Sequence, residues 1–95
     1  MADTEMLTVF CYDVADNRRR RRVARILEDR CVRVQKSVFE ARLTAAASGR
    51  LAEQVSRHLA PGDSLRVYAI GAHGRNRCKS WGACPIAEDQ DFYLL

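Results

Sequence analysis

The first strongly patterned segment of the chain is the apolar run at residues 6–13. In an extended conformation both of its faces are apolar, one formed by Leu7, Val9 and Cys11 and the other by Met6, Phe10 and Tyr12. A strand that is apolar on both faces is typical of the middle of a sheet that is covered on both sides. We therefore predict a central, doubly covered strand that ends at Asp13.

Two later segments have the periodicity of helices. In residues 17–31 an apolar stripe recurs at spacings of three and four, and Asp16 just before it is a typical N-cap. In residues 45–60 apolar residues recur four positions apart, and the turn sequence Pro-Gly-Asp at residues 61–63 follows. We predict a helix for each segment.

The remaining segments favour extended structure. Residues 32–44 alternate irregularly and are predicted to break into two short strands near residues 35–37, whereas residues 64–70 form one strong strand. Residues 71–85, with several basic side chains and Trp81, are predicted to be a basic loop or an irregular hairpin. The apolar tail at residues 92–95 is expected to dock as an edge strand.

The resulting order of elements is β-α-β-β-α-β-β. This order predicts an α+β fold, a ferredoxin-like sandwich with an extra C-terminal strand. A chain of 95 residues forms one domain, which we place at residues 1–95. No apolar run reaches the ~20 residues that cross a bilayer, and the acidic start does not resemble a signal peptide. We therefore expect a cytoplasmic protein that has no membrane partner.

Charge changes this picture more than composition does. The net charge is +4, and fourteen of the sixteen basic residues are arginine, five of them consecutive at residues 18–22. These five occupy the predicted start of a helix, where the helix dipole disfavours cations by a few tenths of a kcal/mol each. A bound phosphate reverses this penalty, because guanidinium groups and free helix N–H groups both favour an anion. The run therefore predicts a phosphate-binding surface, with a solvated helix face as the alternative.

Other candidate chemistry is weaker. Cys11 and Cys31 fit small buried apolar residues, and the spacing of Cys78 and Cys84 is wider than that of usual zinc ligands. A cytosolic location argues against disulfides. Neither His58 nor His73 has the partner pattern of a general base, and no phosphate loop or serine triad occurs in the sequence.

Asp13 needs separate consideration. An aspartate at the end of a strand is most often a turn or capping residue, and a single carboxylate cannot complete the shell of a Mg²⁺ ion. A two-fold axis would bring two copies of Asp13 together and supply a second carboxylate. Such a metal could activate water for phosphodiester cleavage or simply bridge phosphates.

Three sequence segments resemble a known family. They are Tyr-Asp-Val at residues 12–14, Arg-Val-Gln-Lys-Ser-Val-Phe-Glu at residues 33–40, and Pro-Gly-Asp-Ser-Leu-Arg-Val-Tyr at residues 61–68. Together with the arginine run they resemble the small CRISPR-associated endonuclease of the spacer-acquisition machinery, from about residue 6 to the C-terminus. The second segment is the most specific of the three, although Gln35 within it has no role that we can assign.

The resemblance implies a homodimer in which the last strand crosses to the partner, and a Mg²⁺ ion held between the two copies of Asp13. It also implies a metal-dependent nuclease acting on single-stranded RNA or double-stranded DNA, with the larger CRISPR integrase as a partner. The predicted catalytic residues are Asp13, Tyr12, Ser37 and Phe39. The predicted nucleic-acid-binding residues are Arg18, Arg19, Arg20, Arg22 and Arg33.

Two alternatives remain open at this point. The first is a non-catalytic dimeric scaffold that bridges integrase subunits and DNA. The second is a general RNA-binding module of the same fold, which is weakened because no strand carries the aromatic signature of such modules.

Overall fold

The computed structural model describes residues 4–71 and 79–82. Its elements, in chain order, are β1 (Met6–Asp13), α1 (Asn17–Glu28), β2 (Val32–Gln35), β3 (Val38–Leu43), α2 (Ala45–Ser56), β4 (Ser64–Ile70) and β5 (Lys79–Gly82). The predicted order is confirmed from β1 to β4, and so is the break between β2 and β3. Both helices end earlier than predicted, because tight turns follow them: Cys31 N–H donates to the carbonyl of Leu27, and Leu59 N–H donates to that of Ser56.

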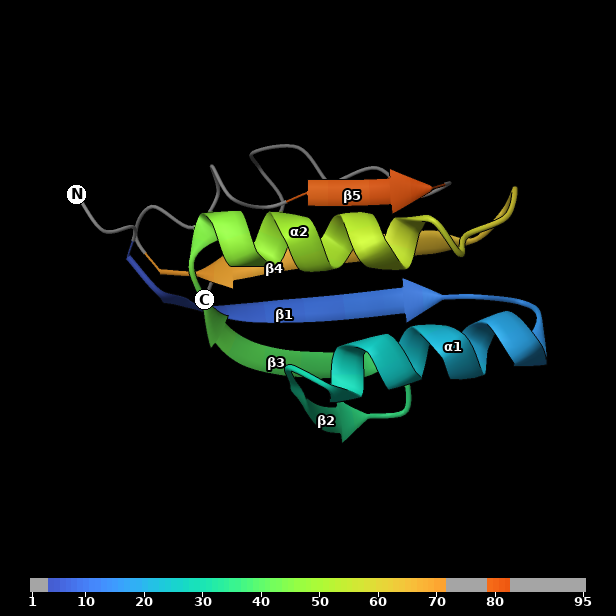
Figure 1. Ribbon diagram of the computed structural model, residues 1–95, viewed down its shortest axis with the longest axis horizontal. Helices are drawn as coiled ribbons and strands as arrows, with labels where there is room; N and C mark the ends of the chain where they lie inside the picture. The colour runs from blue at the N-terminus through green and yellow to red at the C-terminus, as the bar shows by residue number, and fades with distance from the viewer. Residues whose placement is uncertain (1–3, 72–78, 83–95) are drawn as a thin grey trace.

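The five strands form one sheet in the order β2-β3-β1-β4-β5, and every neighbouring pair is antiparallel (Figure 1). β1 therefore lies at the centre, as predicted. The order of the first four strands is that of the ferredoxin-like fold, which confirms the predicted fold class.

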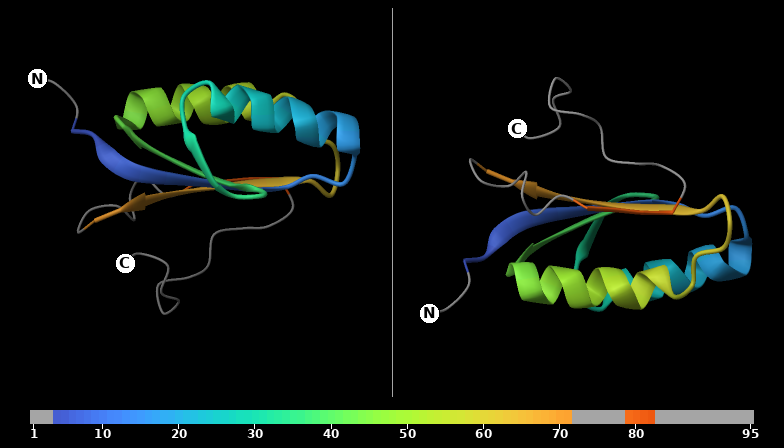
Figure 2. Two further views of the ribbon diagram at one scale, coloured as in Figure 1. Left: turned by 90° about the horizontal axis from the view of Figure 1, so that it is seen from below. Right: turned by 90° about the horizontal axis from the view of Figure 1, so that it is seen from above.

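Both helices lie on the same face of the sheet (Figure 2). α1 connects β1 to β2, and α2 connects β3 to β4. These two crossovers start from antiparallel strands and run in opposite directions across the sheet. Because such connections are right-handed, both helices lie on the same side. The core between them includes Phe10, Phe39 and Leu27, each fully buried. The prediction that β1 is doubly covered is wrong for the described residues, because no described helix covers Leu7, Val9 and Cys11, which are only half-buried.

The fifth described strand differs from the prediction. β5 lies within the segment that was predicted to be a basic loop or an irregular hairpin, while the apolar tail at residues 92–95 lies outside the described residues. β5 pairs with β4 of the same chain, with Trp81 opposite Leu65 and its side chain packed against the core. Partial burial of that indole contributes to the stability of this strand.

Other predictions also fall outside the described residues. Cys78, Cys84 and His73 belong to that part of the chain, so their predicted roles stay predictions. Across residues 4–71 and 79–82, neither helix has the length and apolar character that a membrane crossing requires.

Candidate functional site

A cleft of about 550 Å³ lies where β1 ends. Its walls come from the end of β1, the start of α1 and the turn between β2 and β3. It is lined by Tyr12, Asp13, Val14, Arg20, Arg21, Ala24, Arg33, Lys36 and Ser37, and we call it the Asp13 cleft. The fold thus brings together five of the predicted site residues and adds two cations, Arg21 and Lys36, that the motifs did not single out.

The carboxylate of Asp13 is exposed at the mouth of this cleft. Among the described residues it has no side-chain hydrogen bond and no ion pair, so its lone pairs are available to a ligand. Four cationic side chains and one carboxylate line the cleft, which gives it a positive potential. Such a site attracts a phosphate and places the carboxylate of Asp13, a possible metal ligand, next to it.

Tyr12 connects β1 to the turn that carries Lys36 and Ser37. Its hydroxyl donates to the backbone carbonyl of Lys36 at 3.2 Å, and its backbone N–H donates to the carbonyl of Ser37 at 3.1 Å. Because the hydroxyl is already bonded and the side chain is buried, the geometry favours a positioning role for Tyr12 over the predicted catalytic one.

Phe39 lies beneath the cleft and does not line it. Its ring is 0% exposed and stacks on that of Tyr12 with 6.1 Å between ring centroids. The guanidinium carbon of Arg33 lies 5.0 Å from the centre of the Phe39 ring, within the range of a cation–π contact. Phe39 therefore supports Arg33, and direct contact between its ring and a substrate would require the cleft to open.

The start of α1 follows the predicted capping. Asp16 adopts an extended conformation, and its carboxylate accepts the backbone N–H of Arg19 at 2.9 Å. This hydrogen bond lowers the pKa of Asp16 below its usual value, and nearby Arg18 and Arg19 add to the effect. Arg20 folds back over the loop and donates from Nη1 to the carbonyl of Val14 at 2.9 Å, which fixes one edge of the cleft.

Asp63 is the residue that sequence reasoning missed. Its side chain is 2% exposed, and its carboxylate accepts the backbone N–H groups of Ala60 at 2.9 Å and Ala15 at 3.2 Å. It also accepts Nε–H of Arg19 at 3.2 Å. These hydrogen bonds, first that from Ala60, lower the pKa of Asp63 although burial acts in the opposite direction. Asp63 thus joins the loop after β1 to the loop before β4.

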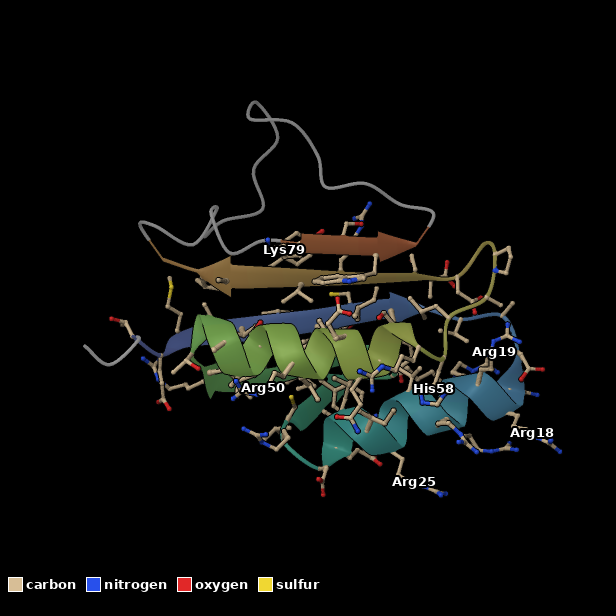
Figure 3. All side chains as sticks on the ribbon, turned by 45° about the horizontal axis from the view of Figure 1, so that its top comes forward. Arg18, Arg19, Arg25, Arg50, His58 and Lys79 are labelled. Atoms are coloured by element: carbon tan, nitrogen blue, oxygen red, sulfur yellow. The ribbon has the colours of Figure 1, made fainter. Side chains whose placement is uncertain are left out.

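The five arginines at residues 18–22 diverge, as a rotation of about 100° per residue requires. Arg19 points to the loop before β4, where Asp63 holds it, so a phosphate would have to compete for its guanidinium (Figure 3). Arg18 and Arg22 do not line the Asp13 cleft. They line a small hollow of about 130 Å³ with Arg21 and Arg25. Two of the five predicted nucleic-acid-binding residues therefore line the Asp13 cleft, Arg20 from α1 and Arg33 from β2.

One protomer offers a metal ion few ligands. Within the described part of the chain, no group of three or more His, Cys, Asp or Glu residues is arranged to hold a metal. The Asp13 cleft supplies one carboxylate and the hydroxyl of Ser37. Mg²⁺ accepts one or two carboxylates together with water and phosphate, so the donor set fits half of a shared site.

The described cysteines take no part in this site. Cys11 and Cys31 are free, half-buried thiols. Burial raises the pKa of Cys11, and it raises the pKa of Cys31 to about 11, so both remain protonated near neutral pH. His58 does not line the Asp13 cleft either.

Comparison with known proteins identifies the family. The sequence profile described as "CRISPR associated protein Cas2" matches residues 6–78. The "CRISPR-associated endoribonuclease Cas2 2" of Synechocystis sp. is 39% identical over 87 residues, which cover 90% of this chain and 94% of that protein. The "CRISPR-associated endoribonuclease Cas2" of Mycobacterium tuberculosis is 37% identical over 82 residues, covering 80% of this chain and 73% of that one.

A solved structure agrees with these relatives. The crystal structure of Streptococcus pyogenes Cas2 matches with a TM-score of 0.63 at 31% identity, over 76% of this chain and 94% of that chain. The profile match covers both β1, which carries Asp13, and the segment that carries Arg33 and Ser37. The chain belongs to the CRISPR-associated Cas2 family.

Proposed function

We propose that this protein is a metal-dependent endonuclease that hydrolyses phosphodiester bonds in the Asp13 cleft. The observation that carries the proposal is the exposed carboxylate of Asp13, which lies among four cationic side chains and has no ion-pair partner in the described part of the chain. The printed names of the curated relatives, which call them endoribonucleases, support the same activity.

Each group in the cleft has a task in this proposal. Arg21, Arg33 and Lys36 bind the phosphate oxygens on either side of the scissile bond. Arg20 keeps the backbone next to Asp13 in place and presents its remaining N–H groups to the same phosphates. A Mg²⁺ ion bound by Asp13 would polarise the phosphoryl oxygen and acidify its bound water.

We propose a homodimer in which two copies of Asp13 share that ion. The face of the sheet that no described helix covers supports a dimer, because it presents half-buried Leu7, Val9 and Cys11 in the centre. Val32 on the outer strand β2 is 70% exposed, which adds an apolar side chain that no described residue covers. Exchange of a C-terminal strand between protomers stays a prediction.

The Asp13→Asn variant tests the activity. This substitution keeps the size of the side chain and removes the charge that would hold the metal. We expect the wild-type protein to cleave single-stranded RNA or double-stranded DNA in the presence of Mg²⁺, and we expect cleavage to stop when EDTA removes the metal. The Asp13→Asn variant should be inactive. Glu5→Gln is the control, since Glu5 is an exposed carboxylate just before β1 and lies outside the Asp13 cleft. Unchanged cleavage by Asp13→Asn overturns the proposal.

A second candidate function is a scaffold that joins CRISPR integrase subunits to DNA during spacer acquisition. The lone carboxylate of the cleft favours this alternative, because a positively charged cleft binds nucleic acid whether or not it holds a metal. We propose the CRISPR integrase as the partner in this role, as the resemblance of the sequence to the spacer-acquisition endonuclease implies. If Asp13→Asn captures the integrase and supports spacer acquisition as well as wild type does, the scaffold role is sufficient and cleavage is dispensable.

A further inference from the structure

A second, larger groove of about 640 Å³ runs between α1 and α2. Its floor is apolar and includes Ile26, Ala47 and Leu51, while its walls carry the guanidinium groups of Arg22, Arg25, Arg30 and Arg50. Figure 3 shows Arg25 projecting from α1 and Arg50 from α2. One carboxylate, that of Asp29, faces these four cations.

These four guanidinium groups have no internal partner in the described part of the chain. Arg19 is held by Asp63 and Arg33 lies near Glu28, but among the described residues no ion pair or side-chain hydrogen bond involves the guanidinium groups of the groove. The helix dipole accounts for Arg25 alone, because it lies in the last turn of α1. Several like charges around one groove repel one another, and a bound anion removes that repulsion.

The small hollow with Arg18 connects the groove to the Asp13 cleft through shared arginines. Arg21 lines both the Asp13 cleft and the hollow that contains Arg18. Arg22 and Arg25 line both that hollow and the groove. Arginines shared between neighbouring hollows therefore link the Asp13 cleft, over the surface of α1, to the groove.

We infer that this series of arginines, which we call the basic track, binds the phosphodiester backbone of a nucleic-acid strand that extends beyond the Asp13 cleft. The basic track comprises Arg18, Arg21, Arg22, Arg25, Arg30 and Arg50. The forked guanidinium groups suit successive phosphates, and the apolar floor suits the sugars between them. The inference rests on the proposed function, because the strand enters the basic track from the cleft in which it would be cleaved.

The length dependence of binding tests the inference. Fluorescence anisotropy would compare labelled single-stranded RNAs of about 4 and about 16 nucleotides, the range of lengths that single-strand-binding domains cover. EDTA in the buffer prevents cleavage during the titration. The test variant is Arg25→Ala/Arg50→Ala, which removes one cation from each wall of the groove. The matched control is Arg57→Ala, an exposed arginine at the end of α2 that does not line the groove.

We expect the double variant to bind the long RNA about tenfold more weakly, and the slope of log K against log salt concentration to fall by about 1.4, that is about 0.7 for each lost phosphate contact. Its affinity for the short RNA should stay within about twofold of wild type, and Arg57→Ala should resemble wild type with both RNAs.

Three results overturn the inference. The first is equal affinity of the double variant and wild type for the long RNA, and the second is an equal loss of affinity with Arg57→Ala. The third is unchanged RNA binding with lost binding of a polyglutamate peptide, which would assign the groove to an acidic protein segment. If wild type binds neither RNA, the proposed function fails with the inference. If it binds both and the double variant binds equally well, only the inference fails.

Discussion

The carboxylate of Asp63 lies 3.1 Å from Nη2 of Arg19 and accepts Nε–H of the same guanidinium at 3.2 Å. Asp63 belongs to the loop before β4 and Arg19 to the first turn of α1, and both segments lie next to the end of β1. Because the carboxylate also accepts the backbone N–H of Ala15, two residues after Asp13, it holds the chain that follows the candidate catalytic aspartate. A residue outside the Asp13 cleft thus fixes the cleft's shape.

The first prediction concerns the stability that Asp63 supplies. Asp63→Asn removes a buried charge that accepts hydrogen bonds from Ala60, Ala15 and Arg19. We expect the free energy of unfolding to fall by about 2 kcal/mol, the usual magnitude for hydrogen bonds to a charged group. Urea denaturation followed by circular dichroism measures this change. The exposed Asp29→Asn is the control, and an equal effect from both substitutions would contradict the role of Asp63.

The second prediction concerns pH. The pKa of Asp63 is lower in the folded protein than in the unfolded chain, so the ionised carboxylate stabilises the fold. This contribution is complete above the unfolded pKa of about 4 and is lost as the pH falls through the folded pKa. The difference in unfolding free energy between wild type and Asp63→Asn should therefore be constant from about pH 7 to about pH 5 and shrink below about pH 4. A difference that grows on acidification would contradict this assignment.

The third prediction separates positioning from catalysis at Tyr12. Tyr12→Phe removes the hydroxyl that donates to the carbonyl of Lys36 and keeps the ring that stacks on Phe39. We expect a loss of about 1 kcal/mol in stability, and a fall in the cleavage rate of less than about tenfold with an unchanged pH profile. Steady-state cleavage between about pH 6 and about pH 9 measures both. Loss of activity as complete as in Asp13→Asn, with a stable fold, would make the Tyr12 hydroxyl a catalytic group after all.

The fourth prediction concerns the attachment of β5. Gly82 has φ +96°, and a Cβ at this position would overlap the backbone carbonyl oxygen of Asp63. Gly82→Ala should therefore displace the end of β5 and expose the only tryptophan of the chain, Trp81. A red shift of tryptophan fluorescence reports that exposure. Gly49→Ala is the control, because it lies within α2 with no atom near the added Cβ, and it should leave the fluorescence unchanged.

Periodicity predicted most of the fold because it reflects the local environment of each side chain. The alternation in β1 and β4 and the stripes of α1 and α2 placed four elements within a few residues. The uncovered face of β1 could not be predicted in this way. Apolar residues at Leu7, Val9 and Cys11 indicate that something covers them, but they do not distinguish a helix of the same chain from another surface.

The site was predicted in part for a similar reason. Motif position assigned Phe39 to catalysis. The register pairs Phe39 with Phe10, whose side chain belongs to the core. Strand alternation alone would therefore have placed Phe39 beneath the cleft. Asp63 stood in a Pro-Gly-Asp turn, which is usually exposed. Its burial depends on Ala15 and Arg19, which are 48 and 44 residues away in sequence, and no local pattern carries that information.

The measurement that tests the shared site most directly is cleavage by mixed dimers. Wild-type and Asp13→Asn chains are unfolded together, refolded at varied ratios, and assayed with Mg²⁺ at constant total protein. If both copies of Asp13 hold one ion, only dimers of two wild-type chains are active, and an equal mixture retains about one quarter of the wild-type activity. A quadratic dependence on the wild-type fraction is the predicted result. A linear dependence, with about half of the activity in the equal mixture, would show that each cleft works alone and contradict the shared site.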